Sequence, residues 1–135
     1  MRFELVDAVL ERDEQRIVTV KNVTAAEEYL GDHFPGFPIL PGVMMLEAMV
    51  QAARRLLEET GVEEAGTAPP SSGRWVLGEV RNVRYGNMVR PGQKLTVEVQ
   101  RIKAEGGRHT FQGRGTVEGA VAVQGRFVMR NLICQ

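Results

Sequence analysis

His33 and Glu47 are two side chains that can exchange protons, and both lie in one short stretch of the sequence. His33 opens the run HFPGFPILPG, and Glu47 follows within the apolar run VMMLEAMV. An imidazole titrates near neutral pH and can act as a general base. Burial of a carboxyl group disfavours its charged form, so such a group can donate a proton at neutral pH. The pair therefore predicts an acid–base site. Each residue taken alone has an alternative interpretation. His33 alone would be a structural residue, and Glu47 alone would be a structural acid paired with another side chain.

The loop from residue 32 to 40 must position the histidine. Pro35, Pro38 and Pro41 fix backbone torsions, so the loop loses little entropy when it becomes ordered. Gly36 is interpreted as a turn residue alone. A loop of this kind can hold one side chain in a constant position.

A helix that is apolar on most faces must position Glu47. We predict it over residues 42–59, because Pro41 suits a first helical turn and Gly61 suits a stop. Its first turns are apolar nearly all round, and polar residues gather only from Arg54 onward. A helix of this composition is enclosed on most sides by the rest of the protein.

The other segments predict strands. Leu95, Val97 and Val99 alternate with polar residues, which is typical of a half-buried strand. Strands are expected over residues 3–10, 16–23, 74–85, 93–104, 108–117 and 120–131, with a short helix over 25–30 and a surface loop over 62–73. An antiparallel sheet curled around the helix would give one α+β domain spanning residues 1–135. The exposed edges of such a sheet favour dimerisation by edge-to-edge pairing.

Composition excludes several classes of protein. The 135 residues carry 17 Lys+Arg and 17 Asp+Glu, and zero net charge argues against general nucleic-acid binding. The basic residues have two equally open interpretations, a local patch for an acidic protein or phosphate groups, and scattered solvated charge; they are Arg54, Arg55, Arg81, Arg84, Arg90 and Lys94. The single cysteine, Cys134, permits no internal disulfide and indicates a reducing, cytoplasmic location. No signal peptide is recognisable, and the apolar segment 38–53 is shorter than the roughly 20 residues of a membrane span.

The segment 32–53, DHFPGFPILPGVMMLEAMVQAA, closely resembles the active-site segment of the 3-hydroxyacyl-acyl-carrier-protein dehydratases of the FabZ type. The flanking runs FELVD, KNVT and VRPGQKL resemble the opening strands and a later turn of that family. The resemblance covers nearly the whole chain. It implies the hotdog fold, a long central helix wrapped by a curved antiparallel sheet. It also implies dehydration of (3R)-3-hydroxyacyl thioesters to trans-2-enoyl thioesters in fatty acid synthesis.

The resemblance also implies roles for particular residues. His33 would be the catalytic base, Glu47 the catalytic acid, and the N–H of Gly42 the group that binds the thioester carbonyl. Gln51 either holds the carboxylate of Glu47 or is a polar residue without a role. The further site residues are Ile39 behind the site and Phe37, Met44 and Met45 along the acyl tunnel, each with simple packing as its alternative.

The implied partner is an acyl-carrier-protein or CoA thioester, with no cofactor. We expect no metal either, because two histidines far apart and one terminal cysteine form no ligand set. The resemblance implies a homodimer in which histidine and acid come from opposite subunits, with a trimer of dimers as a larger assembly. A hotdog thioesterase and a non-catalytic acyl-binding subunit are the alternatives. The histidine loop disfavours the first, and the presence of both His33 and Glu47 argues against the second.

Overall fold

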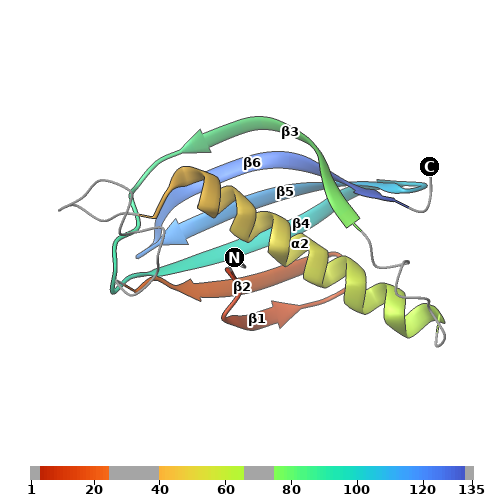
Figure 1. Cartoon of the computed structure of the whole chain (residues 1–135), viewed down its shortest axis with the longest axis horizontal. Coiled ribbons are helices and arrows are strands. Elements are labelled where there is room, and N and C mark those ends of the chain that lie inside the picture. The colour runs from red at the N-terminus through yellow and green to blue at the C-terminus, as the bar shows by residue number, and fades with distance from the viewer. Residues whose placement is uncertain (1–3, 25–39, 66–74, 133–135) are drawn as a thin grey trace.

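The computed structural model describes residues 4–24, 40–65 and 75–132. In chain order the elements are β1 (Ala8–Arg12), β2 (Arg16–Asn22), α2 (Gly42–Ala65), β3 (Trp75–Tyr85), β4 (Lys94–Glu105), β5 (Arg108–Val117) and β6 (Ala120–Asn131). Figure 1 shows the long helix α2 lying across the sheet. The predicted short helix and the loop that carries His33 lie outside the described residues.

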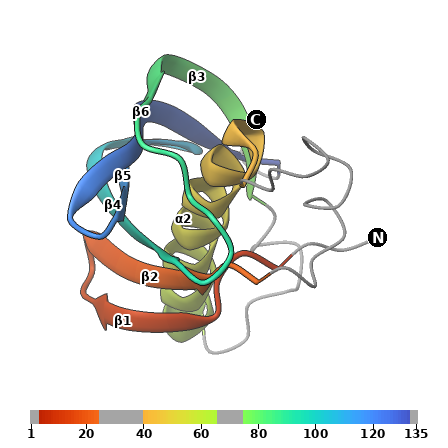
Figure 2. The ribbon, with the colours of Figure 1, turned by 90° about the vertical axis from the view of Figure 1, so that its left-hand side faces the viewer.

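The strands form one antiparallel 6-stranded sheet in the order β1-β2-β4-β5-β6-β3. The strands curve so that the sheet wraps around α2, which Figure 2 shows nearly end-on. Strands β4, β5 and β6 follow one another through tight turns, whereas β3 crosses over to pair with β6. This arrangement leaves β1 and β3 as the outer strands of the described sheet.

The core lies between α2 and the concave face of the sheet. Met49 and Ala52 of the helix are fully buried, as are Phe111 of β5 and Phe127 of β6. The helix approaches the sheet closely at Gly113, where a Cβ atom would lie 2.6 Å from Met49 Sδ. A helix with apolar residues on most faces therefore meets a surface that can cover it.

Three element boundaries differ from the sequence prediction by more than one residue. The first strand ends at Arg12 rather than residue 10. It begins at Ala8 rather than residue 3, because the backbone N–H of Leu5 donates to Gln51 Oε1 instead of to a neighbouring strand. Helix α2 continues through Gly61 to Ala65, so residues 62–65 are helical and not part of a loop. Glycine costs a helix only about 1 kcal/mol relative to alanine, and Glu63, Glu64 and Ala65 favour continuation.

The remaining boundaries agree with the prediction to within one residue, because alternating strands separated by glycine turns carry a strong local signal. No helix in the described ranges is long and apolar enough to cross a membrane.

Candidate active site

The first turn of α2 presents backbone N–H groups at one end of the molecule. Leu40 N donates to Val89 O at 2.8 Å, which anchors the start of the helix to the segment between β3 and β4. Pro41 O accepts Met44 N at 2.9 Å and Met45 N at 3.2 Å. Among the described residues, no hydrogen bond uses the N–H of Gly42 or of Val43. The helix dipole gives such N–H groups a partial positive charge, which suits a developing oxyanion.

Tyr85, the last residue of β3, packs directly against Gly42. A Cβ atom on Gly42 would lie 3.0 Å from Tyr85 Cε1 and 3.1 Å from Tyr85 Cζ. Gly86 N donates to Ala122 O at 2.8 Å, so the chain just after Tyr85 is fixed to β6. Glycine at position 42 is therefore explained by this close approach, since any larger residue would displace the ring or the helix.

Glu47 lies one turn further along α2 and is held by Gln51. Gln51 Nε2 donates to Glu47 Oε2 at 3.1 Å, and Gln51 Oε1 accepts the backbone N–H of Leu5 at 2.8 Å. The i,i+4 spacing brings the two side chains together on one helix face. Because Leu5 fixes the amide orientation, the NH₂ group of Gln51 points toward the carboxylate. Glu47 itself is partly buried.

The helix face around Glu47 is only partly covered by the sheet. Val43 is 64% exposed, and Met44, Leu46 and Glu47 are partly buried. Exposed apolar side chains continue nearby on the sheet side, where Tyr85 is 52% and Met88 49% exposed. Val43, Tyr85 and Met88 thus form an exposed apolar rim beside the head of the helix.

The other predicted site residues divide into two groups. Met45 is 4% exposed and belongs to the core, and Met44 packs against that core from a partly buried position. His33, Phe37 and Ile39 lie outside the described residues. The assignment of roles at this site therefore stays a prediction.

Two contributors to the site were not anticipated from the sequence. Tyr85 had a weak signal, because it ends a strand and is followed by glycine. The Leu5 backbone had none, since its hydrogen bond with Gln51 depends on the packing of two distant segments. Within residues 4–24, 40–65 and 75–132, no group of three or more His, Cys, Asp or Glu side chains could hold a metal ion.

Solved structures define the class of fold. The dehydratase heterocomplex ApeI:P from Xenorhabdus doucetiae superposes with a TM-score of 0.77 at 21% identity, covering 95% of this chain and 82% of that one. A hypothetical thioesterase protein with coenzyme A from Streptococcus pneumoniae superposes with a TM-score of 0.67 at 11% identity, covering 91% of this chain and 83% of that one. At these identities the likeness concerns the fold alone, and the fold is the predicted hotdog.

Sequence comparison defines the family. A model of the FabA-like domain matches residues 1–126. The 3-hydroxyacyl-[acyl-carrier-protein] dehydratase FabZ of Lactococcus lactis subsp. cremoris is 38% identical over 124 residues, which cover 91% of this chain and 81% of that protein. Its namesake from Thermus thermophilus is 40% identical over 118 residues, covering 87% of this chain and 78% of that protein. The chain belongs to the FabA-like family and, within it, to the FabZ-type dehydratases. The predicted family and the hydro-lyase class of enzyme are confirmed.

Proposed function

We propose that the chain dehydrates (3R)-3-hydroxyacyl thioesters with His33 as base, Glu47 as acid and Gly42 as the carbonyl-binding residue. His33 removes the C2 proton, the C2–C3 double bond forms, and the C3–O bond breaks. Glu47 gives its proton to the departing hydroxyl group, which leaves as water. The single observation that carries this proposal is the orientation of Glu47 by Gln51, on a helix whose first N–H groups donate to none of the described residues.

The helix head contributes electrostatic stabilisation of the transition state in this proposal. Negative charge builds up on the thioester oxygen when the C2 proton leaves, and an N–H at a helix N-terminus stabilises that charge without reorganising. Losing one donor of this type raises an activation barrier by roughly 3–4 kcal/mol in enzymes where it was measured. The ring of Tyr85 packs against Gly42 at this end of the helix.

We infer a homodimer whose two sites each combine His33 of one subunit with Glu47 of the other. Two features of the described residues support this. Strand β3, with 11 residues, is an outer strand of the described sheet and offers a long edge for antiparallel pairing. The partly uncovered face of α2 around Val43 and Leu46 would be buried by a second copy. A trimer of such dimers is the larger assembly we propose.

We propose a carrier-protein thioester as the substrate, as in the names of the curated relatives, in the cytoplasm. Arg84 and Arg90 are exposed at the end of the molecule where Tyr85 and Met88 form the apolar rim. This combination of cationic and apolar side chains suits the docking of an acidic partner that delivers an acyl chain.

A product assay tests the reaction. Incubation with 3-hydroxyacyl carrier-protein and CoA thioesters of graded length should give the ultraviolet absorbance of an enoyl thioester without release of free thiol. His33→Ala and Glu47→Gln should each abolish this absorbance while the protein stays folded, and Glu118→Gln, at an exposed turn, should not. Thiol release would instead establish a thioesterase, and binding of every substrate without turnover would establish a non-catalytic subunit.

A further inference from the structure

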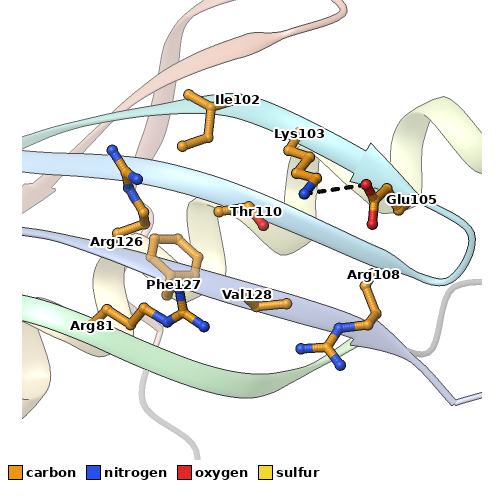
Figure 3. A pocket seen from close by; sticks show the side chains of 9 residues that line it. All are labelled: Arg81, Ile102, Lys103, Glu105, Arg108, Thr110, Arg126, Phe127 and Val128. Carbon is orange, nitrogen blue, oxygen red and sulfur yellow. Dashed lines mark ion pairs between the residues drawn. The ribbon is translucent and has the colours of Figure 1, made fainter.

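A cationic groove crosses the convex face of the sheet, on the side away from α2. Figure 3 looks onto this face, with the helix behind the strands. The groove has a volume of about 480 Å³. Its lining residues come from four strands and are Arg81, Ile102, Lys103, Glu105, Arg108, Thr110, Arg126, Phe127 and Val128.

The strand registers place like charges opposite one another in this groove and beside it. Arg81 of β3 is directly opposite Arg126 of β6, and Arg108 of β5 is directly opposite Arg130 of β6. Like charges directly opposite one another on a sheet face are destabilising. A chain with zero net charge thus concentrates positive charge on one face, at a cost to its own stability, and such an arrangement is relieved by a bound anion.

Acidic side chains neutralise only part of this charge. Arg81 pairs with Glu79, and Lys103 Nζ lies 3.2 Å from Glu105 Oε1. Arg108 and Arg126 form no ion pair with any of the described residues. The remaining contact of Arg126 is a long hydrogen bond from its Nε to Gln112 Oε1 at 3.4 Å. The guanidinium groups of Arg108 and Arg126 are therefore available to a ligand.

β-Bulges lie in both strands that flank the groove. The register between β4 and β5 shifts between Arg101 and Lys103, and the register between β3 and β6 shifts between Leu77 and Glu79. A bulge bends its strand and redirects the neighbouring side chains. The bulge in β4 brings Ile102 and Lys103 to the groove together, as Figure 3 shows. The recess is thus built by local departures from regular pairing.

We propose that this groove binds a phosphorylated organic ligand. The guanidinium groups of Arg108 and Arg126, which Figure 3 shows at opposite ends of the groove, contact its anionic groups. Guanidinium groups donate paired hydrogen bonds that match the geometry of phosphate oxygens. The hydroxyl group of Thr110 supplies another donor, and Ile102 and Val128 give an apolar surface for the organic part of the ligand. The site is separate from the proposed active site, because it opens on the opposite face of the sheet from Glu47.

The shape of the surface favours a small ligand over a macromolecule. A volume of about 480 Å³ falls in the range of sites for small molecules, roughly 300–1,000 Å³. A membrane or an acidic protein would be better matched by a flat or convex patch than by a recess bounded by bulged strands.

Calorimetric titration of the full chain tests the proposal, with ADP and inorganic pyrophosphate as probes. We expect both to bind at low ionic strength and ADP to bind more tightly, since the apolar floor contacts only an organic group. The double variant Arg108→Gln, Arg126→Gln should raise the dissociation constant at least about tenfold. Arg114→Gln is the matched control, because Arg114 lies on the same face of β5 outside the groove, and it should change the constant less than about twofold.

Three results would overturn the proposal. The first is absence of binding up to about 10 mM of either probe, which leaves no specific site. The second is an equal loss of affinity in Arg114→Gln, which would reduce the effect to general surface charge. The third is binding of the protein to phosphatidylglycerol vesicles, lost in the double variant, while neither probe binds or competes. That result would assign this face to membrane binding. The double variant should retain full dehydratase turnover, so failure of this proposal is distinguishable from failure of the catalytic one.

Discussion

Gln51 connects the proposed catalytic acid to the start of the chain. Both ends of its side-chain amide are used: the NH₂ group donates to Glu47 Oε2 at 3.1 Å, and the oxygen accepts the N–H of Leu5 at 2.8 Å. A side chain held at both ends restricts the carboxyl group of Glu47 to one orientation, and orientation of a reacting group contributes strongly to rate.

We therefore expect Gln51→Ala to lower kcat roughly 10- to 100-fold, because the carboxyl group is no longer oriented, with a smaller change in KM. Gln51→Glu should lower kcat more than Gln51→Ala. A second carboxylate repels Glu47, and it can accept the N–H of Leu5 but has no N–H to donate to Glu47. Steady-state kinetics of both variants would measure this, with Gln100→Ala on the exposed part of β4 as the control. An unchanged kcat in Gln51→Ala would remove the positioning role.

Gly42 and Tyr85 provide a second residue-level prediction. Gly42→Ala should lower kcat/KM about tenfold, since the new methyl group would lie 3.0 Å from Tyr85 Cε1 and must displace the ring or the helix head. In a Tyr85→Ala background the methyl group has space, so Gly42→Ala should lower kcat/KM much less there. Kinetics of the two single variants and the double variant give this comparison. Equal costs in both backgrounds would contradict the steric account.

His109 gives the chain a pH dependence of stability that is unrelated to catalysis. Burial lowers the pKa of His109 below its usual value of 6.5, and the Arg101 guanidinium, 3.2 Å away through Nη1 and Nδ1, lowers it further. The Trp75 ring covers it on another side, with ring centroids 4.8 Å apart. The unfolded chain then binds a proton more readily than the folded chain, so the stabilisation present above about pH 6.5 is lost as the pH falls through the folded-state pKa.

Denaturant unfolding at pH 7.5 and 5.5 should thus give a smaller free energy of unfolding at the lower pH. His109→Gln should show a weaker decrease over the same interval. If wild type and variant lost equal stability, another group would be responsible.

At the scale of elements, the C-terminal end of α2 is the boundary that the sequence patterns predicted least well. Gly61 predicts a stop, yet the helix passes through it to Ala65. Only Gly92, Gly106 and Gly119 have positive φ angles among the described glycines, so Gly61 has no left-handed conformation that would require glycine.

Gly61→Ala should therefore stabilise the protein by about 0.5–1 kcal/mol, because alanine loses less backbone entropy in a helix. Thermal and denaturant unfolding would measure the gain. Gly119→Ala is the contrasting control, since φ of +82° at Gly119 is unfavourable for alanine and should reduce stability. A destabilising effect of Gly61→Ala would mean that the helix ends where the sequence pattern placed its stop.

At the scale of the whole molecule, sequence patterns predicted the strands and the central helix better than the contacts between distant segments. The alternation in β4 and the glycine turns beside β5 and β6 predicted those strands to within one residue, because these signals are local. The first strand was misplaced because the partner of Leu5 is a side chain of α2. The contact between Tyr85 and Gly42 and the arginine pairs of the groove arise from strand order and register, which no local pattern encodes.

The proposed site likewise combines features that local sequence patterns predict with features that they do not. The spacing of Glu47 and Gln51 on one helix face follows from helical periodicity, and their hydrogen bond is its consequence. The pairing of His33 with Glu47 across two subunits depends on an assembly that one chain does not contain, and it remains the central prediction.

Mixing two inactive variants tests that prediction most directly. His33→Ala and Glu47→Gln chains, unfolded together and refolded at equal concentrations, should form hybrid dimers in which one of the two sites keeps both wild-type groups. Random association makes half of all dimers hybrid, so we predict recovery of about a quarter of wild-type dehydratase activity. Mixtures that stay as inactive as their components, although hybrid dimers are demonstrated by mass spectrometry, would contradict a site shared between two subunits.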